Sequence, residues 1–326
     1  MSERVLVCIL SQTRAHELTW PTFKHHVLDE LNADLALCIG VDDTYDYANP
    51  FWQAARFRWT VPELADYGDG FDEAQAWWAA RAGVEPVDWR QLLSIRDQWL
   101  GAIEGQDKQS GSGAIQIYFR WVLYRHLVDT DILGQYDRVI VTRSDFIWPV
   151  PHPPLALLSP RFIWTGDGEH YGGITDRYLL VAAGDLLPAI NPMEEIVLRP
   201  RRMARSMRWH WSWNPEKVLA RHLRRQRMAR RVRFFPYVMY TVRGVADSSR
   251  WRMGDFDEAL GAYVKYETEY ASAKLYERIG SAADWQKLAK DEPGLFHRTW
   301  PQAPWRNPVY RLRPYRRALV NYMGRS

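Results

Sequence analysis

The chain has 326 residues, of which 47% are apolar and 14% aromatic, and its formal net charge is +4. This composition predicts a globular protein with a large buried core and excludes intrinsic disorder. No run reaches the roughly 18 apolar residues of a membrane-spanning helix, and the first apolar run is shorter than a signal peptide. Cys8 and Cys38, both in apolar runs, are expected to be reduced core residues. We therefore expect a cytoplasmic protein.

The first third of the chain alternates strand and helix patterns. Strands are predicted over residues 4–10, 34–41 and 57–61, and helices over 15–31, 72–81 and 87–103. A strand, loop, helix and strand in this order favour a parallel sheet.

The middle and end of the chain continue the pattern. The polar, Gly-rich segment Glu104–Gly113 is expected to be a mobile loop. After it come predicted helices that begin near Ile115 and over 214–226, and predicted strands over 138–142, 161–165, 178–183, 231–236 and 237–242. Residues 255–326 are interpreted as helices with Pro-rich breaks. The domain organisation predicted from this order is a domain over 1–245 and a helical, basic extension over 246–326.

Arg143 and Asp145 directly follow the apolar strand 138–142. Ligand sites of open α/β sheets lie at the carboxyl ends of buried strands. Asp145 is therefore a candidate ligand for Mg²⁺ or Mn²⁺ held by a diphosphate, and Arg143 a candidate for phosphate or sugar. A strand-end ion pair between the two residues is the alternative.

Two other strand ends carry polar residues. Ser11, Gln12 and Arg14 lie between the first strand and a helix, where a nucleotide can be received. Asp42 and Asp43 end the second strand, where a carboxylate can bind ribose hydroxyls or a base edge. Strand ends also carry polar residues merely because the chain reaches solvent there. Neither a GxGxxG nor a GxxxxGKS motif is present, which disfavours dinucleotide-binding and P-loop proteins.

Positive charge is concentrated in two segments. Residues 199–233 contain 12 Arg and one Lys against a single acid, Glu216, and residues 293–326 contain seven Arg and no acid. Such segments indicate an anionic partner, which can be a nucleotide, an anionic lipid surface or nucleic acid. A solvated basic face without a partner is the alternative for the first segment, and packing of a terminal helix for the second.

Several segments together carry a family resemblance. They are SQTR at 11–14, DD at 42–43, QIYFRWVLYRHL at 116–127, YDRVIVTRSDFIW at 136–148, GGITDRYLLVAAG at 172–184 and NPEKVLARHL at 214–223. Over residues 4–243 the chain resembles nucleotide-sugar glycosyltransferases of the GT-A type, especially bacterial and viral enzymes that assemble polysaccharides. The resemblance implies a mixed, mainly parallel α/β sheet flanked by helices.

The resemblance also implies roles for individual residues. An Asp-x-Asp motif that holds the metal and the donor diphosphate is expected at 143–145, but the chain has Arg-Ser-Asp there, so only Asp145 corresponds to a metal ligand. Arg143 is then an alternative source of positive charge. An inverting transfer needs a carboxylate base, for which Asp176 is the first choice and Asp167, Glu169 and Glu216 are alternatives. For Glu216, interaction with a helix dipole is the competing interpretation.

These observations lead to one functional hypothesis and two alternatives. We expect a cytoplasmic hexosyl- or deoxyhexosyltransferase that uses a divalent cation, a nucleotide-sugar donor and a glycan or lipid-linked acceptor, with segment 104–113 closing over the donor. The basic C-terminus is expected to contact the inner membrane surface. The alternatives are a nucleic-acid-binding protein that uses residues 199–233, for which a recognition motif is missing, and a glycosyltransferase-like protein that binds sugar nucleotides without catalysis.

Overall fold

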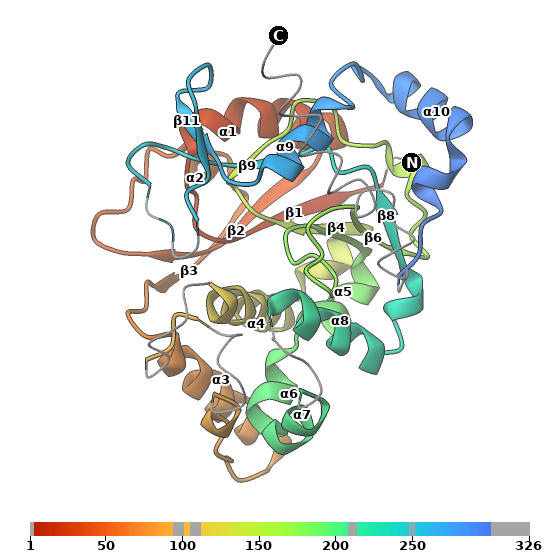
Figure 1. The fold of residues 1–326 in the computed structure, drawn as a ribbon. Coiled ribbons are helices and arrows are strands. Elements are labelled where there is room, and N and C mark those ends of the chain that lie inside the picture. The colour runs from red at the N-terminus through yellow and green to blue at the C-terminus, as the bar shows by residue number, and fades with distance from the viewer. Residues whose placement is uncertain are drawn as a thin grey trace.

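The computed structural model describes residues 3–93, 101–104, 112–207, 214–247, 249 and 252–300. Its centre is a seven-stranded sheet with the strand order β3-β2-β1-β4-β7-β6-β8 (Figure 1). The strands are β1 (Val5–Ser11), β2 (Asp34–Val41), β3 (Phe57–Pro62), β4 (Arg138–Thr142), β6 (Ile163–Gly166), β7 (Leu179–Ala182) and β8 (Val232–Phe235). Parallel pairings join β3, β2, β1 and β4, whereas β7 runs antiparallel to both β4 and β6. The predicted mixed, mainly parallel sheet is confirmed.

Helices cover both faces of the sheet (Figure 1). One face carries α1 (His16–Phe23), which continues as a π-helical turn (Lys24–Asp29), together with α2 (Pro50–Ala54), α9 (Glu267–Lys274) and α10 (Ala282–Asp291). The other carries α3 (Tyr67–Ala82), α4 (Gly113–Thr130), α5 (Ala183–Ile190), α6 (Met193–Leu198), α7 (Pro200–Met207) and α8 (Pro215–Arg225). Short 3₁₀ turns lie at Arg90–Leu92, Ile132–Gln135, Leu155–Leu157, Ala229–Arg231 and Pro293–Phe296. The described helices include none that is long and apolar enough to cross a membrane.

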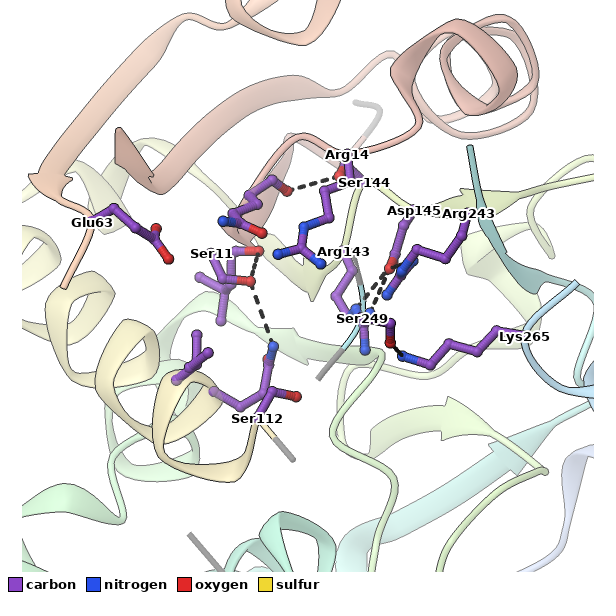
Figure 2. Close-up of a pocket in the computed structure, with 14 residues that line it drawn as sticks. Ser11, Arg14, Glu63, Ser112, Arg143, Ser144, Asp145, Arg243, Ser249 and Lys265 are labelled. Atoms are coloured by element: carbon purple, nitrogen blue, oxygen red, sulfur yellow. Dashed lines mark hydrogen bonds and ion pairs between the residues drawn. The ribbon is translucent and has the colours of Figure 1, made fainter. Parts of the chain in front are cut away.

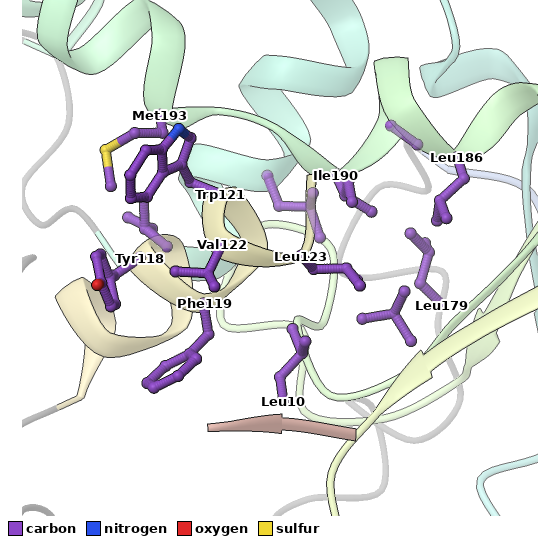
Figure 3. Close-up of a cluster of buried hydrophobic side chains, with 14 of the residues drawn as sticks. Leu10, Tyr118, Phe119, Trp121, Val122, Leu123, Leu179, Leu186, Ile190 and Met193 are labelled. Carbon is purple, nitrogen blue, oxygen red and sulfur yellow. The ribbon is translucent and has the colours of Figure 1, made fainter. Parts of the chain in front are cut away.

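The central strand β1 is buried on both faces, which is why its sequence is a continuous apolar run. Leu6, Cys8 and Leu10 pack into the core on the α4 side, and the residues between them pack into the core on the α1 side. Helix α4 lies between the sheet and the outer helices, and its side chains contact groups from β1, β7, α5 and α6 (Figure 3). The carboxyl end of β1 is thereby held on a fully packed base.

A second, four-stranded sheet has the order β10-β11-β9-β5 and is antiparallel throughout. Its strands are β5 (Phe146–Ile147), β9 (Tyr240–Arg243), β10 (Asp255–Asp257) and β11 (Ala262–Val264). The prediction that residues after 255 are entirely helical is therefore wrong for β10 and β11. Both strands are short. Their conformation is decided by the pairing of β11 with β9, which lies earlier in the chain, and not by a local sequence pattern.

Residues 87–93 also differ from expectation, because they form only the Arg90–Leu92 turn rather than a helix. Trp89 and Arg90 both reach back to α3, where the indole N–H donates to Asp72 Oδ1 at 2.8 Å and the guanidinium binds both carboxylate oxygens at 2.7 Å. These bonds favour a loop lying against α3. The rest of this predicted helix, up to residue 100, lies outside the described residues.

The segment after residue 246 packs onto the rest of the protein. Trp285 of α10 is fully buried in the core that contains Val5 and Ile9 of β1. Its indole N–H donates to the carbonyl of Pro151 at 2.9 Å. The described helices of the extension thus share a core with the main sheet, while the boundary at residue 245 stays a prediction.

Candidate active site

Two adjoining hollows lie at the carboxyl edge of strands β1, β2, β3 and β4. The smaller, here called the cation pocket, is lined by Ser11, Gln12, Arg14, Glu63, Arg143, Asp145, Arg243 and Lys265, among others (Figure 2). The larger, here called the groove, encloses about 750 Å³ and is lined by Thr13, His16, Asp42, Tyr45, Asn49, Glu63 and Asp247, among others. Parallel strands end at a common edge, so residues that are distant in the sequence meet here.

Asp145 is the anionic centre of the cation pocket. Its Oδ1 accepts a hydrogen bond from Arg143 Nε at 3.0 Å, and its Oδ2 is ion-paired with both Arg143 and Arg243. Burial opposes ionisation of Asp145, but the two guanidinium groups outweigh it and lower its pKa well below the ordinary value. Asp145 is therefore a carboxylate. The strand-end ion pair that sequence reasoning offered as an alternative is present, joined by a second arginine.

The small sheet explains how Arg243 and Lys265 reach this pocket. Strand β5 begins one residue after Asp145 and pairs with β9, so that the Val242 N–H donates to the Asp145 carbonyl at 3.0 Å. Strand β11 pairs with the other edge of β9, and the Lys265 N–H donates to the Thr241 carbonyl at 2.9 Å. Asp145 is therefore next to Val242 and Lys265 next to Thr241, so both side chains lie within two residues of Arg243 along β9.

Positive charge exceeds negative charge in the pocket. Among the residues that the structure describes, four cationic side chains and two acidic ones line it. Burial, then Arg243 and Arg143, lower the pKa of Lys265 to about 7. Burial and Arg243 likewise lower the pKa of Arg14. A bound anion would stabilise the charged forms of Lys265 and Arg14, which their positive neighbours disfavour.

The residues around Asp145 do not fit the expected divalent cation. Both carboxylate oxygens are engaged by arginines, and the side chains closest to them are positively charged. In the described part of the chain, no three His, Cys, Asp or Glu side chains gather as a metal site would need. Mg²⁺ and Mn²⁺ bind through carboxylates and phosphates rather than beside guanidinium groups. The chemistry of this donor set favours an anion.

The loop after β1 forms the border between the two hollows. Ser11 has a left-handed backbone with φ of 72°, and the Gln12 carbonyl accepts a hydrogen bond from Ser144 Oγ at 2.8 Å. Asn49 Nδ2 donates to Thr13 Oγ1 at 2.9 Å. Strand-end loops after β1, β2 and β4 are therefore linked. Ser11, Gln12 and Arg14, the candidates that follow the first predicted strand, all line the cation pocket.

The two candidate aspartates after β2 differ. Asp42 lines the groove, and its Oδ1 accepts hydrogen bonds from the Thr44 N–H at 2.8 Å and hydroxyl at 2.7 Å, which lower its pKa. Asp43 is exposed and does not line either hollow. The structure therefore brings Asp42, but not Asp43, to the site.

The candidate bases form a third group, here called the carboxylate cluster: Glu169, Asp176 and Glu216, all buried. Because β7 runs antiparallel to β4, the turn before β7 lies at the carboxyl end of β4, and Thr142 Oγ1 donates to the Arg177 carbonyl at 3.1 Å. The same reversal puts Asp176 beside the cation pocket. Burial works against the charge of Arg143, but Asp145, and to a smaller extent Asp176, raise its pKa overall.

The Asp176 carboxylate acts on Glu216 as a buried like charge. Burial, and next the Asp176 carboxylate, raise the pKa of Glu216 to about 8. Glu169 accepts a hydrogen bond from the Thr268 hydroxyl. Next to the cluster, Arg177 is ion-paired at 2.5 Å with Glu269, which is fully buried. Glu216 is thus a buried carboxyl with a strongly raised pKa, as sites of acid–base chemistry have. This favours a catalytic role over the helix-dipole interaction that was the competing interpretation.

Asp167, the remaining alternative for the base, has cationic partners of its own. It is ion-paired with Arg298 and lies 3.5 Å from His170 Nε2. Hydrogen bonding from His170, together with Arg298, lowers the pKa of Asp167 against the effect of burial. A carboxylate stabilised in this way is a weak base.

Sequence reasoning missed Arg243, Lys265 and Glu63. Arg243 directly follows the predicted strand 237–242, so its position at a strand end was a usable signal. Lys265 follows a strand that was expected to be helix, and no signal pointed to it. Glu63 follows β3 as Asp42 follows β2, and its Oε1 accepts a hydrogen bond from the Tyr67 hydroxyl at 3.1 Å.

Two other predictions concern segments that the structure describes in part. Residues 105–111 of the predicted lid and residues 301–326 of the basic C-terminus lie outside the described residues; Ser112, at the end of the lid segment, lines the cation pocket. In segment 199–233, Arg221 and Arg225 are ion-paired with Glu195, and Arg231 with Asp185. These arginines bind neighbouring elements of the protein.

Comparisons with known proteins give weak similarity to solved structures. No family model and no curated protein sequence matches the chain. Among solved structures, it is similar to the apo form of mouse xyloside xylosyltransferase 1, with a TM-score of 0.34 and 8% identity over 73% of this chain and 86% of that chain. A likeness at this level does not assign an activity, so the function of the chain has to follow from its own site.

Proposed function

We propose that the protein is a glycosyltransferase that moves a sugar from a nucleotide-sugar donor to a glycan or lipid-linked acceptor. The observation that carries this proposal is the position of the cation pocket, which shares Gln12, Arg14 and Glu63 with the groove and whose Arg143 is acted on by Asp176 of the carboxylate cluster. An inverting sugar transfer uses those three elements: a place for the nucleoside, positive charge for the diphosphate and a carboxylate for the acceptor proton.

In the proposed reaction the nucleoside lies in the groove, where Asp42 is available to the ribose hydroxyls. The bond between the anomeric carbon and the diphosphate oxygen breaks, and the bond to the acceptor oxygen forms. Arg14 and Arg143 stabilise the negative charge of the departing nucleoside diphosphate.

The proton of the acceptor hydroxyl goes to the carboxylate cluster. Glu216 is suited to hold this proton, because its pKa of about 8 lies near neutral pH. The Asp176 carboxylate links Glu216 to the cation pocket electrostatically, because it contributes to raising the pKa of both Glu216 and Arg143. We assign the base to this pair.

The alternatives are supported less well. A nucleic-acid-binding protein is disfavoured because segment 199–233 lacks a recognition motif, and because Arg221, Arg225 and Arg231 are engaged in ion pairs within the protein, although other arginines of the segment are exposed. A protein that only binds sugar nucleotides would not need a buried carboxyl with a raised pKa beside the diphosphate.

Thermal unfolding with a panel of nucleotide sugars tests the proposal, because a ligand that binds the native state raises its melting temperature. We expect at least one nucleotide sugar to raise it, and Arg143→Lys to reduce this shift because lysine lacks the forked geometry of arginine. Arg278→Lys, at an exposed position that lines neither hollow, is the matched control. Nucleoside diphosphate release with an added glycan acceptor then measures transfer. The absence of any shift across the panel, with and without Mn²⁺, would contradict the proposal.

A further inference from the structure

We propose that Arg243 and Lys265 bind the diphosphate of the donor together with Arg14 and Arg143, and that this binding needs no divalent cation. The inference rests on the proposed function for the identity of the donor. It goes further because it assigns two residues from the small sheet to the site and replaces the expected metal ion by fixed side-chain charge.

The first support is convergence. The four cationic side chains come from four places: the loop after β1, the turn after β4, the end of β9 and the residue after β11. All line one pocket, where Figure 2 shows Arg143 and Arg243 on either side of the Asp145 carboxylate and Lys265 next to them. Like charges repel, so four cations from separate elements gather only where an anion offsets their repulsion.

The second support is that cationic side chains outnumber acidic ones among the described residues of the lining; Asp247 and Asp176 act on Arg14 and Arg143 from outside it. Asp145 and Glu63 are the acidic side chains that line the pocket in the described part of the chain. Asp145 is shared between Arg143 and Arg243, and one oxygen of Glu63 is bound by the Tyr67 hydroxyl at 3.1 Å. A diphosphate, with its several anionic oxygens, supplies the negative charge that this pocket lacks.

The third support is that a guanidinium group contacts Asp145 where a metal ion would be expected to bind. A divalent cation in such a site bridges a carboxylate and the diphosphate, and neutralises the charge that develops on the leaving group. At Asp145, the Arg243 guanidinium occupies the position of that cation, since it contacts Oδ2 and is itself almost fully buried. Arg243 is held in place through its own Nη1, which also donates to the Val242 carbonyl at 2.7 Å. A fixed guanidinium needs no reorganisation to stabilise the leaving group.

Calorimetric titration tests the inference with inorganic pyrophosphate and four nucleoside diphosphates (those of adenosine, guanosine, cytidine and uridine), each in EDTA and each in Mn²⁺. We expect at least one of these probes to bind in EDTA, with an affinity that Mn²⁺ does not increase. Lys265→Ala should weaken that binding by about tenfold or more, which corresponds to the loss of one charge-assisted hydrogen bond. Lys265→Arg should restore most of it.

Lys274→Ala is the matched control, because Lys274 lies on α9, is exposed and pairs with Glu277 at 3.0 Å. Lys265 is only half-buried, so its variants are expected to fold, and circular dichroism with urea unfolding verifies this. Arg243→Lys is a second variant that keeps the charge but loses the forked contact, and it should also weaken binding in EDTA.

The outcomes separate the inference from the proposed function. Binding that occurs only with Mn²⁺, or that Lys265→Ala leaves unchanged, overturns the inference and leaves the glycosyltransferase standing. Binding in EDTA that depends on Lys265, without transfer from any nucleotide sugar, supports the inference and counts against the glycosyltransferase. If no probe binds under either condition, both are overturned.

Discussion

The backbone carbonyl of Glu216 accepts a hydrogen bond from the N–H of Ile174 at 3.1 Å. This bond ties the first turn of α8 to the Gly-rich turn before β7. It brings Glu216 next to Asp176, although a long stretch of chain separates the two residues. The acid–base chemistry of the site therefore depends on a backbone contact as well as on the carboxyl groups.

Replacing Glu216 by Gln should change how stability depends on pH. The folded-state pKa is raised from 4.5 to about 8, so the native state binds the proton more tightly than the unfolded state does. The stabilisation is complete below about pH 4.5 and is lost as the pH rises through about 8. Gln cannot ionise, so urea unfolding between about pH 5 and pH 8 should show a smaller decline in the free energy of unfolding for Glu216→Gln.

The same variant tests the catalytic assignment. If Glu216 takes the acceptor proton, Glu216→Gln should lower kcat by about a hundredfold or more while nucleotide binding is retained. Glu258→Gln, at an exposed position in the small sheet region, is the control for loss of one carboxylate. An unchanged kcat in Glu216→Gln would move the base to Asp176.

Asp145→Ala should destabilise the fold without abolishing it. The substitution leaves Arg143 and Arg243 without their shared partner, and removing one member of a buried ion pair costs about 3 kcal/mol or more. We also expect loss of donor turnover. Added pyrophosphate should raise the melting temperature of Asp145→Ala more than that of the wild type, since the anion then balances the exposed guanidinium charge. Equal shifts would argue against a pyrophosphate site between these arginines.

The affinity for a nucleotide sugar should fall as the pH rises through about 7. Burial, Arg243 and Arg143 lower the pKa of Lys265 to about 7 in the free protein, and an anion binds better to the charged form. The loss approaches about tenfold per pH unit above that value. A nucleotide sugar is a suitable probe, because its diphosphate diester does not titrate in this range. Lys265→Arg, which stays charged, should bind with little change between about pH 6 and pH 8.5.

Gly173→Ala should destabilise the protein by about 2 kcal/mol or more, because the added methyl group would clash with the backbone of α8. A Cβ atom at Gly173 would lie 2.1 Å from the Glu216 carbonyl oxygen, so the turn and α8 would have to separate. Gly184 in α5 is a matched control, because a Cβ atom there meets nothing within 4 Å. Gly184→Ala should be neutral or slightly stabilising in urea unfolding. Equal stability of the two variants would contradict the close contact.

The main sheet could be predicted from the sequence because its central strands are buried on both faces and therefore form continuous apolar runs. Val5–Ser11, Asp34–Val41 and Arg138–Thr142 were predicted to within one residue at each end. Strand β10 (Asp255–Asp257) has two acids among its three residues, and no apolar pattern marks it. Its partner β11 depends on β9 for its conformation, and pairing across the chain cannot be inferred from a local pattern.

The residues of the candidate site likewise fall into those that the sequence could predict and those that it could not. Arg14, Arg143 and Asp145 follow strands that the sequence predicts, so their meeting at one edge could be expected. Arg243 and Lys265 reach the pocket through the small sheet, whose register with β5 is a property of the folded chain. The burial of Glu216 follows from its contact with the turn before β7, which no pattern within α8 reveals.

The pairing of β5 with β9 and of β9 with β11 also has a consequence for biosynthesis. During translation Arg14 and Arg143 leave the ribosome well before Lys265, and domains fold as their segments emerge. The carboxylate of Asp145 is then available to Arg143 before Arg243 exists to share it. The anion site is complete only after β11 has been synthesised and has paired with β9. A chain that terminates between these two strands lacks the ammonium group of Lys265, however much of the main sheet it has formed.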